Sequence, residues 1–143
     1  PARSRAIVNG HFLLAEPRQG FSFLGLVGGL GQWLFVRGDV ASLTVSAAGA
    51  LADVTSEEIA HRLWADACRA LDLGAAPLPP YRIVKEKRAT FAQTPGEIPF
   101  RAGARTDKAN LFLAGDWTDT GLPATIEGAV LSGRIAAGAV LAT

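Results

Sequence analysis

The sequence predicts an α+β fold, in which an antiparallel or mixed sheet with one amphipathic helix is followed by a strand-loop-helix unit. Three observations support this prediction. The first half of the chain contains short apolar runs separated by turn residues, a pattern typical of antiparallel strands. The apolar spacing then changes to that of a helix. The end of the chain combines a short apolar run, a polar loop and a stretch rich in small residues.

Four apolar runs make up the predicted sheet. They span residues 7–15, 21–27, 32–36 and 42–47. Pro17 and Gly20 separate the first two runs, and Arg37-Gly38-Asp39 is predicted to form a turn between the last two. The same triplet matches an adhesion motif, but a turn explains it fully and a match of this length is common by chance.

A capping box opens the predicted amphipathic helix at residues 56–73. Thr55 is the expected N-cap, and Glu58 follows three residues later. Gly74 is a natural helix stop. Beyond it, residues 81–91 predict a further strand with charged residues in its middle.

Composition describes a soluble globular domain. The 143 residues are 49% hydrophobic and 19% charged, with a formal net charge of +1. Because the net charge is near zero, nothing attracts the whole chain to nucleic acid or anionic lipid. No stretch reaches the roughly 18 uncharged apolar residues of a spanning helix. Since the chain begins with Pro1 and contains no methionine, we expect that an N-terminal part of the protein precedes it.

The polar residues in the first two thirds of the chain indicate no catalytic or metal site. The single cysteine, Cys68, lies in a predicted helix, which favours a buried structural thiol and a reducing compartment. His11 and His61 are far apart and lack a companion carboxylate pattern, so neither a metal site nor a nucleophilic triad is predicted. The basic residues of 82–88 lie near aromatic residues, yet Glu86 interrupts them, and a solvated strand explains them better than a nucleic-acid site does.

The end of the chain is predicted to carry a ligand site. Residues 110–114 are predicted to form a short buried strand, 115–123 a loop and 124–141 a helix. Asp116 would then lie at the carboxyl edge of the strand, where ligands bind in open α/β sheets. The first turn of the helix offers unpaired amides and a partial positive charge to an electron-rich group.

Small residues recur every fourth position along the predicted last helix. They are Ala124, Gly128, Ser132 and Ala136. Such a stripe allows either another backbone or a flat cofactor to approach closely. The residues alone therefore leave two interpretations open, a ligand site and a closely packed strand-loop-helix unit.

The string LFLAGDWTDTGLPATIEGAVLSGRIAA resembles the C-terminal flavin signature of the amine oxidase and phytoene desaturase superfamily. Within it, the chain is most similar to the squalene-associated FAD-dependent desaturases, also described as hydroxysqualene dehydroxylases. The strings IVNGHFLL, QWLFVRGD, SLTVSAAG and EKRATFAQTPG look like that subgroup in the same order. The resemblance therefore covers nearly the whole chain.

The resemblance implies FAD as the cofactor. Asp116 matches the acidic residue whose carboxylate accepts a hydrogen bond from the ribityl chain, and Gly115 lets the backbone approach. The amide of Ile126 is expected to meet the flavin near N1 and O2. The full set of cofactor-binding residues that the resemblance implies is Gly115, Asp116, Thr125, Ile126, Glu127, Gly128 and Ala129.

The resemblance also implies a division of the chain. Residues 1–92 would be the late part of a substrate-binding domain, 93–104 an irregular connection, and 105–143 the C-terminal segment of a Rossmann-like FAD-binding domain. The dinucleotide fingerprint G-x-G-x-x-G is absent from the sequence. The glycine cluster at 28–31 precedes a strand pattern and is predicted to be a hairpin loop. Because the chain thus contains no dinucleotide fingerprint, we expect this chain alone to be inactive.

The implied activity is that of an FAD-dependent oxidoreductase acting on an apolar polyprenoid of the squalene or hydroxysqualene type, in hopanoid biosynthesis. Another member of the amine oxidase and carotenoid desaturase superfamily is the alternative among enzymes. A non-catalytic module that binds a lipid or a protein partner is the alternative outside them. The sequence identifies no catalytic acid or base. We expect a cytoplasmic protein, and leave open peripheral association with the inner membrane and homodimer formation.

Overall fold

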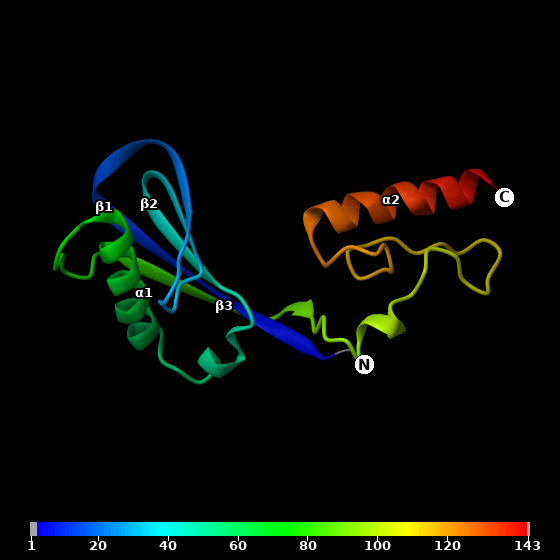
Figure 1. Cartoon of the computed structure of the whole chain (residues 1–143), viewed down its shortest axis with the longest axis horizontal. Coiled ribbons are helices and arrows are strands. Elements are labelled where there is room, and N and C mark those ends of the chain that lie inside the picture. The colour runs from blue at the N-terminus through cyan, green and yellow to red at the C-terminus, as the bar shows by residue number, and fades with distance from the viewer. Residues whose placement is uncertain (1–2, 143) are drawn as a thin grey trace. The chain divides into compact units, whose positions relative to one another are not determined.

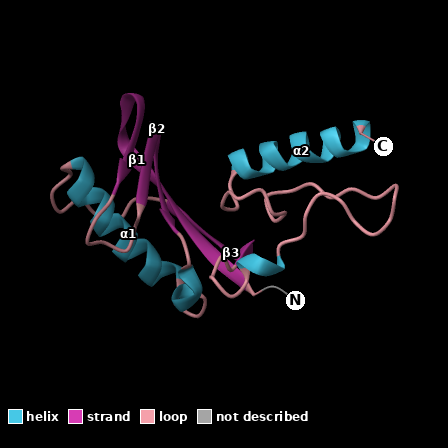
Figure 2. Ribbon diagram, turned by 45° about the vertical axis from the view of Figure 1, so that its right-hand side comes forward, coloured by secondary structure: helices cyan, strands magenta, loops and turns pink. Residues whose placement is uncertain are grey.

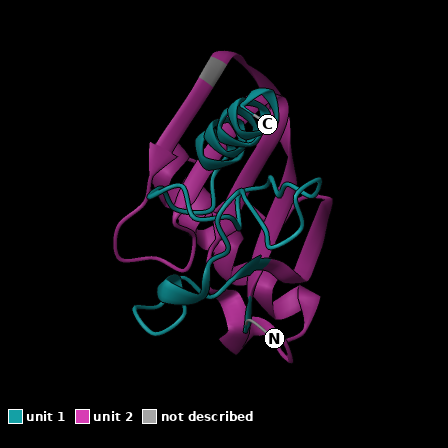
Figure 3. Ribbon diagram, turned by 90° about the vertical axis from the view of Figure 1, so that its right-hand side faces the viewer, with its two compact units in different colours: residues 1–4, 90–143 teal, residues 5–89 magenta. Residues whose placement is uncertain are grey.

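A computed structural model describes residues 3–142, apart from the side chain of Phe21 (Figure 1). The fold is α+β, as predicted, with a three-stranded sheet and two α-helices (Figure 2). The chain divides into two compact units (Figure 3). We call residues 5–89 the sheet unit, and residues 90–143 with residues 1–4 the C-terminal unit.

The sheet contains β1 (Ser4–Gly25), β2 (Trp33–Val45) and β3 (Tyr81–Phe91), in the order β2-β1-β3. β1 and β2 pair antiparallel, in a register that runs from Val8 opposite Val45 to Gly25 opposite Trp33. Two backbone hydrogen bonds, from Leu13 N to the Pro80 oxygen and from Ala92 N to the Arg3 oxygen, give β1 and β3 the same antiparallel sense. The predicted antiparallel pairing is confirmed, and the predicted strand at 81–91 has the observed bounds.

The breaks predicted inside the first two strands are wrong. β1 continues through Pro17 and Gly20, and β2 continues through Arg37-Gly38-Asp39. The register between the two strands shifts on both sides of Arg18, which is opposite Gly38. Gly20 and Gly38 have φ of 79° and 59°, so they take the left-handed conformations that such irregularities require. The turn residues therefore bend a long hairpin instead of ending its strands.

The predicted hairpin loop at the glycine cluster is confirmed, since residues 26–32 join β1 to β2. The buried carboxylate of Asp66 accepts a 2.8 Å hydrogen bond from the Gly31 amide and another from Arg69. A Cβ on Gly29 would lie 2.5 Å from the same carboxylate. The cluster is thus rich in glycine because a helix side chain occupies the space beside its backbone.

Helix α1 (Ser56–Leu71) begins as predicted and ends two residues before the predicted position. Thr55 Oγ1 accepts a 3.1 Å hydrogen bond from the Glu58 amide, which confirms the N-cap. Asp72 takes the left-handed conformation with φ of 54° and closes the helix. A short 3-10 helix, Ala48–Leu51, lies between β2 and α1.

The apolar face of α1 packs on the sheet. Ile59, Leu63 and Ala67 of the helix are fully buried, and on β2 the buried positions alternate. The core of the sheet unit consists of Val8, Phe12, Leu14, Leu34, Val36, Ala41, Leu43, Val45, Ala48, Leu51, Ile59, Ala60, Leu63, Trp64, Ala67, Cys68 and Leu71.

The C-terminal unit contains α2 (Ile126–Leu141) and a short 3-10 helix, Ile98–Phe100. The strand predicted at residues 110–114 is wrong. Only an isolated bridge between Phe112 and Arg105 and a hydrogen bond from Leu113 N to the Ala104 oxygen are present there. A buried strand needs hydrogen-bonded partners, and the three-stranded sheet of the described chain does not include this segment. Within residues 3–142, no helix is both long and apolar enough to cross a membrane.

Candidate functional site

Hydrogen bonds join the loop before α2 to the middle of that helix. The amide of Gly115 donates a 2.8 Å hydrogen bond to Ser132 Oγ, and the Thr118 hydroxyl lies 2.6 Å from the same oxygen. Thr118 also donates to the Gly115 carbonyl. Thr118 and Ser132 are almost fully buried, at 2% and 1% exposure. These contacts hold the predicted site residue Gly115 against the helix.

The small-residue stripe of α2 faces this loop. Gly128, Ser132, Ala136 and Ala139 are the buried positions of the helix. A Cβ on Gly128 would lie 2.6 Å from the Pro123 carbonyl oxygen, so the loop backbone comes too close for a larger residue. At Gly128, the stripe therefore allows the loop backbone to approach the helix closely.

Arg101 also binds the same loop, through its backbone carbonyls. Its guanidinium donates to the backbone carbonyls of Asp116 at 2.9 Å, Trp117 at 3.3 Å and Leu122 at 2.7 Å, and also to that of Thr118. The guanidinium carbon lies 5.5 Å from the centroid of the Phe91 ring, within cation–π range. Backbone carbonyls from both ends of loop 116–122 thus bind the guanidinium of Arg101.

The start of α2 presents free amides. Thr125 is the N-cap, and its Oγ1 accepts a 3.1 Å hydrogen bond from the Gly128 amide. The Ala124 amide donates to Gln93 Oε1. Within the described chain, nothing accepts a hydrogen bond from the amides of Ile126 or Glu127. These donors, with the dipole of a sixteen-residue helix behind them, favour an electron-rich group at this position.

Asp116 places a carboxylate near the beginning of the loop. The residue is partly buried, and its side chain forms no hydrogen bond or ion pair within residues 3–142. The preceding Gly115 has φ of 149°, and a Cβ there would lie 2.4 Å from the Trp117 indole nitrogen. The carboxylate is therefore available as an acceptor, on a backbone that only glycine allows.

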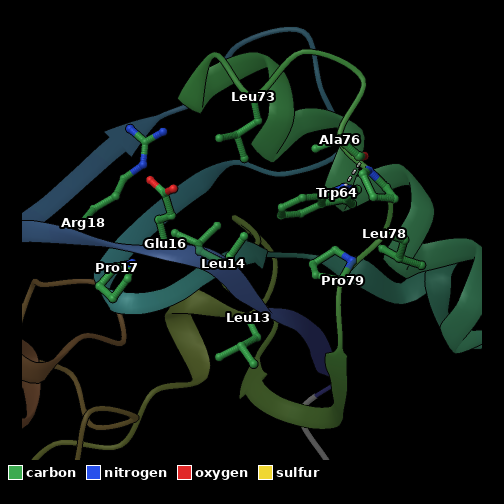
Figure 4. Close-up of a pocket in the computed structure, with 12 residues that line it drawn as sticks. Leu13, Leu14, Glu16, Pro17, Arg18, Trp64, Leu73, Ala76, Leu78 and Pro79 are labelled. Atoms are coloured by element: carbon green, nitrogen blue, oxygen red, sulfur yellow. Dashed lines mark hydrogen bonds between the residues drawn. The ribbon is translucent and has the colours of Figure 1, made fainter.

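A cavity of about 520 Å³ opens in the sheet unit (Figure 4). Its lining is mainly apolar and comes from β1, α1 and the loop that follows the helix. Trp64 Nε1 donates to the Ala76 carbonyl and so holds that loop against the helix, while Arg18 donates to the carbonyl of Leu71, the last residue of α1. The lining residues are Leu13, Leu14, Ala15, Glu16, Pro17, Arg18, Trp64, Leu73, Ala76, Pro77, Leu78 and Pro79.

Large apolar side chains also remain exposed near the tip of the hairpin. Phe23 stacks on Trp33 and on Phe35, with ring centroids 5.7 Å and 5.9 Å apart. Phe23 is 56% exposed. The apolar residues of the strands from Phe12 to Phe35 could form either a core or the wall of a hydrocarbon channel. The structure divides them, because Phe12 and Leu34 are buried in the core whereas Phe23 and Trp33 are exposed.

The comparisons with known proteins identify the family. A sequence profile described as flavin containing amine oxidoreductase matches residues 35–141, which include the loop and helix described above. The chain belongs to the flavin containing amine oxidoreductase family.

Curated relatives in this family extend the likeness to nearly the whole chain. The hydroxysqualene dehydroxylase of Rhodopseudomonas palustris is 48% identical over 99% of this chain and 34% of its own length. That of Sinorhizobium fredii is 48% identical over 96% of the chain and 33% of its own length. A 15-cis-phytoene desaturase of Synechococcus elongatus is 42% identical over 47% of the chain and 14% of its own length. The chain thus spans about a third of the length of its hydroxysqualene dehydroxylase relatives.

Membership of the amine oxidoreductase family implies a flavin cofactor, and the residues at the loop and helix fit one. A flavin has hydroxyl groups that can donate hydrogen bonds to a carboxylate, and an electron-rich ring edge that backbone amides can stabilise. Asp116 has a free carboxylate, and Ile126 and Glu127 have free amides. Thr125, Gly128 and Ala129 contribute differently, as the cap and the first turn of α2.

Sequence reasoning missed Arg101 and the role of Ser132. Ser132 was recognised only as a small residue, although its hydroxyl joins the loop to the helix. Arg101 lies in a segment without regular pattern, and nothing in the sequence marks it as a ligand of backbone carbonyls. The buried Cys68 confirms the predicted structural thiol, and burial raises its pKa, while a hydrogen bond with the Ala76 backbone acts in the opposite direction.

Proposed function

We propose that this chain is the C-terminal part of an FAD-dependent oxidoreductase that acts on an apolar polyprenoid of the squalene or hydroxysqualene type, in hopanoid biosynthesis. One observation carries the proposal. Curated hydroxysqualene dehydroxylases are 48% identical to the chain along almost its entire length, from the sheet unit to α2. Flavin-dependent desaturation of a carotenoid-type substrate is the second candidate, supported by the shorter match to a 15-cis-phytoene desaturase.

In this proposal, seven residues of the C-terminal unit hold FAD. Asp116 accepts a hydrogen bond from the ribityl chain, and the amides of Ile126 and Glu127 donate to the pyrimidine edge of the ring. When bound, the flavin supplies the redox chemistry, while the protein orients it and tunes its electronics. Gly115, Thr125, Gly128 and Ala129 shape the backbone around it. Residues 105–143 would then complete a Rossmann-like domain whose dinucleotide fingerprint lies elsewhere in the protein.

The sheet unit suits the apolar substrate of this proposal. Its cavity beside Trp64 and Leu78 is lined mainly by apolar side chains, and the stack of Phe23, Trp33 and Phe35 is exposed. A hydrocarbon gains free energy when such surfaces remove it from water. We therefore assign residues 1–92 to the substrate-binding domain. Because a polyprenoid dissolves in lipid, we place the protein in the cytoplasm, in peripheral contact with the inner membrane.

The test uses the full-length protein and its Asp116→Asn variant. We expect purified wild type to absorb near 450 nm, as oxidised flavins do at roughly that wavelength, and to convert hydroxysqualene to squalene with a reductant present. Because a charge-assisted hydrogen bond is lost, Asp116→Asn should weaken FAD binding about tenfold.

The matched control is Asp119→Asn, an exposed acid of the same loop whose side chain only accepts a bond from the Gly121 amide. Its FAD affinity should stay within about twofold of wild type. Conversion of phytoene instead of hydroxysqualene would establish the second candidate. A wild-type protein that is colourless even after incubation with FAD would overturn both.

A further inference from the structure

We propose that Arg101 is the positioning residue of the cofactor site. It sets the separation between the Asp116 carboxylate and the first amides of α2. The inference rests on the proposed function for the identity of the cofactor, but its structural part concerns only contacts within the C-terminal unit. Arg101 itself touches neither the substrate nor the reacting atoms in this proposal.

The backbone carbonyls that accept hydrogen bonds from Arg101 lie at both ends of the loop and between them. The guanidinium binds the Asp116 carbonyl at the beginning of the loop and the Leu122 carbonyl near its end, with the carbonyls of Trp117 and Thr118 between them. Leu122 is three residues before the N-cap Thr125. A single rigid group therefore joins the backbone that carries the carboxylate to the backbone that enters the helix.

This arrangement depends on a guanidinium. Several carbonyl dipoles converge on one point, and without a cation between them their negative ends would repel one another. Arginine offers five donors in a fixed planar fork, whereas lysine offers three on a flexible chain. The ring of Phe91 lies against the guanidinium and restricts it further.

The charge of Arg101 is not neutralised by an acid. Within residues 3–142, the ion pairs are Arg62 with Glu58 and Arg69 with Asp66, both in the sheet unit. The guanidinium therefore keeps its positive charge at the loop that carries Asp116. A positive field near a flavin favours its anionic reduced form, so removing the charge should lower the flavin's reduction potential.

Arg105 provides a matched control in the same unit. Its guanidinium donates to one backbone carbonyl, that of Ala139, at 3.2 Å, and lies 5.8 Å from the centroid of the Phe112 ring. It thus makes the same two kinds of contact, but at the C-terminal half of α2 and not at the loop. Arg105→Met removes an equal charge without releasing residues 116–122.

The experiment compares Arg101→Lys, Arg101→Met and Arg105→Met in the full-length protein. Amide hydrogen exchange of residues 115–123 is measured without cofactor, and then FAD affinity and the flavin midpoint potential are measured. We expect exchange in the loop to rise at least about tenfold in both Arg101 variants, because local opening follows lost contacts. FAD affinity should fall about tenfold in Arg101→Met and less in Arg101→Lys, which keeps the charge. Arg105→Met should match wild type in loop exchange and FAD affinity.

The outcomes separate the two proposals. Unchanged loop exchange in both Arg101 variants overturns the inference, whatever the cofactor. Faster loop exchange with unchanged FAD affinity and potential also overturns it, because the loop then does not position the site. A lower potential in Arg101→Met with a near-normal value in Arg101→Lys supports it, since a purely structural role would not separate these variants by charge. A wild-type protein that binds no FAD contradicts the proposed function, while the exchange data still test the loop.

Discussion

Different interactions stabilise the sheet unit and the C-terminal unit. The sheet unit buries large side chains such as Phe12, Leu63 and Trp64 in one continuous core. In the described part of the C-terminal unit, the buried hydrophobic residues are Ala92, Ala136 and Ala139. Several of its larger apolar side chains are exposed, among them Phe100 at 84%, Ile126 at 87% and Leu141 at 89%.

This contrast teaches that the two units depend differently on surfaces outside this chain. Burying a leucine or phenylalanine contributes about 1.5–3 kcal/mol, whereas a hydrogen bond contributes about 1 kcal/mol net. The C-terminal unit relies on hydrogen bonds around Ser132 and Arg101. We therefore expect it to gain most from the additional protein surface that its longer relatives possess.

The largest effect should come from the core of the sheet unit. Leu63 is fully buried, so Leu63→Ala loses transfer free energy and leaves a cavity. The free energy of unfolding should fall by about 2–5 kcal/mol in urea titrations followed by tryptophan fluorescence. Leu111→Ala in the C-terminal unit, where the residue is 49% exposed, is the control and should change it by less than about 0.5 kcal/mol. Equal losses in both variants would contradict the contrast between the units.

An intermediate effect is expected where the C-terminal unit depends on polar contacts. Ser132→Ala leaves the half-buried Gly115 amide and the buried Thr118 hydroxyl without their shared partner. The unit should lose about 1–3 kcal/mol, measured by hydrogen exchange at residues 115–118. Gly133→Ala, on the exposed side of the same helix, should instead stabilise it by about 0.5–1 kcal/mol. Slow exchange in Ser132→Ala would show that apolar contacts suffice.

The smallest effect concerns Cys68 in the sheet unit. Burial raises the pKa of its thiol above the value in the unfolded chain. As the pH rises through the pKa of the unfolded thiol, the unfolded state loses its proton first, so stability decreases until the folded thiol also ionises. Alkylation by iodoacetamide at pH 8 should be much slower in the folded than in the unfolded protein. Removing the thiol in Cys68→Ala should abolish this pH-dependent part of the stability.

Local signals predicted the helices better than the strands. The side chains of Thr55 and Thr125 each accept a hydrogen bond from an amide three residues later, so both helix starts are contained in a few neighbouring residues. The hairpin was predicted in pieces because Pro17, Gly20 and Gly38 usually end strands. In the folded chain, β1 and β2 pair across these residues, and the register between the two strands shifts there.

The sequence predicted the residues of the candidate site, but not the residues that hold its loop in place. Asp116 and the approximate start of α2 could be located because a glycine and an acid are followed by a loop and a stretch of small residues in one short string. Arg101 could not be, since it binds residues 15 to 21 positions later through backbone atoms, which every residue possesses. Asp66 was missed for the same reason, because its partner is the amide of Gly31.

The sequence by itself therefore determined the α+β class, the start of α1, the strand at 81–91 and the family to which the chain belongs. These features depend on side-chain patterns that neighbouring residues carry. Helix α2 begins at Ile126, two residues after its predicted start at residue 124. Only the tertiary structure decided that the first strands form one long hairpin, that residues 110–114 form no strand, and that Arg101 and Asp66 hold distant loops. The physical reason is that backbone amides and carbonyls are identical along the chain, so their partners become known only when the chain is folded.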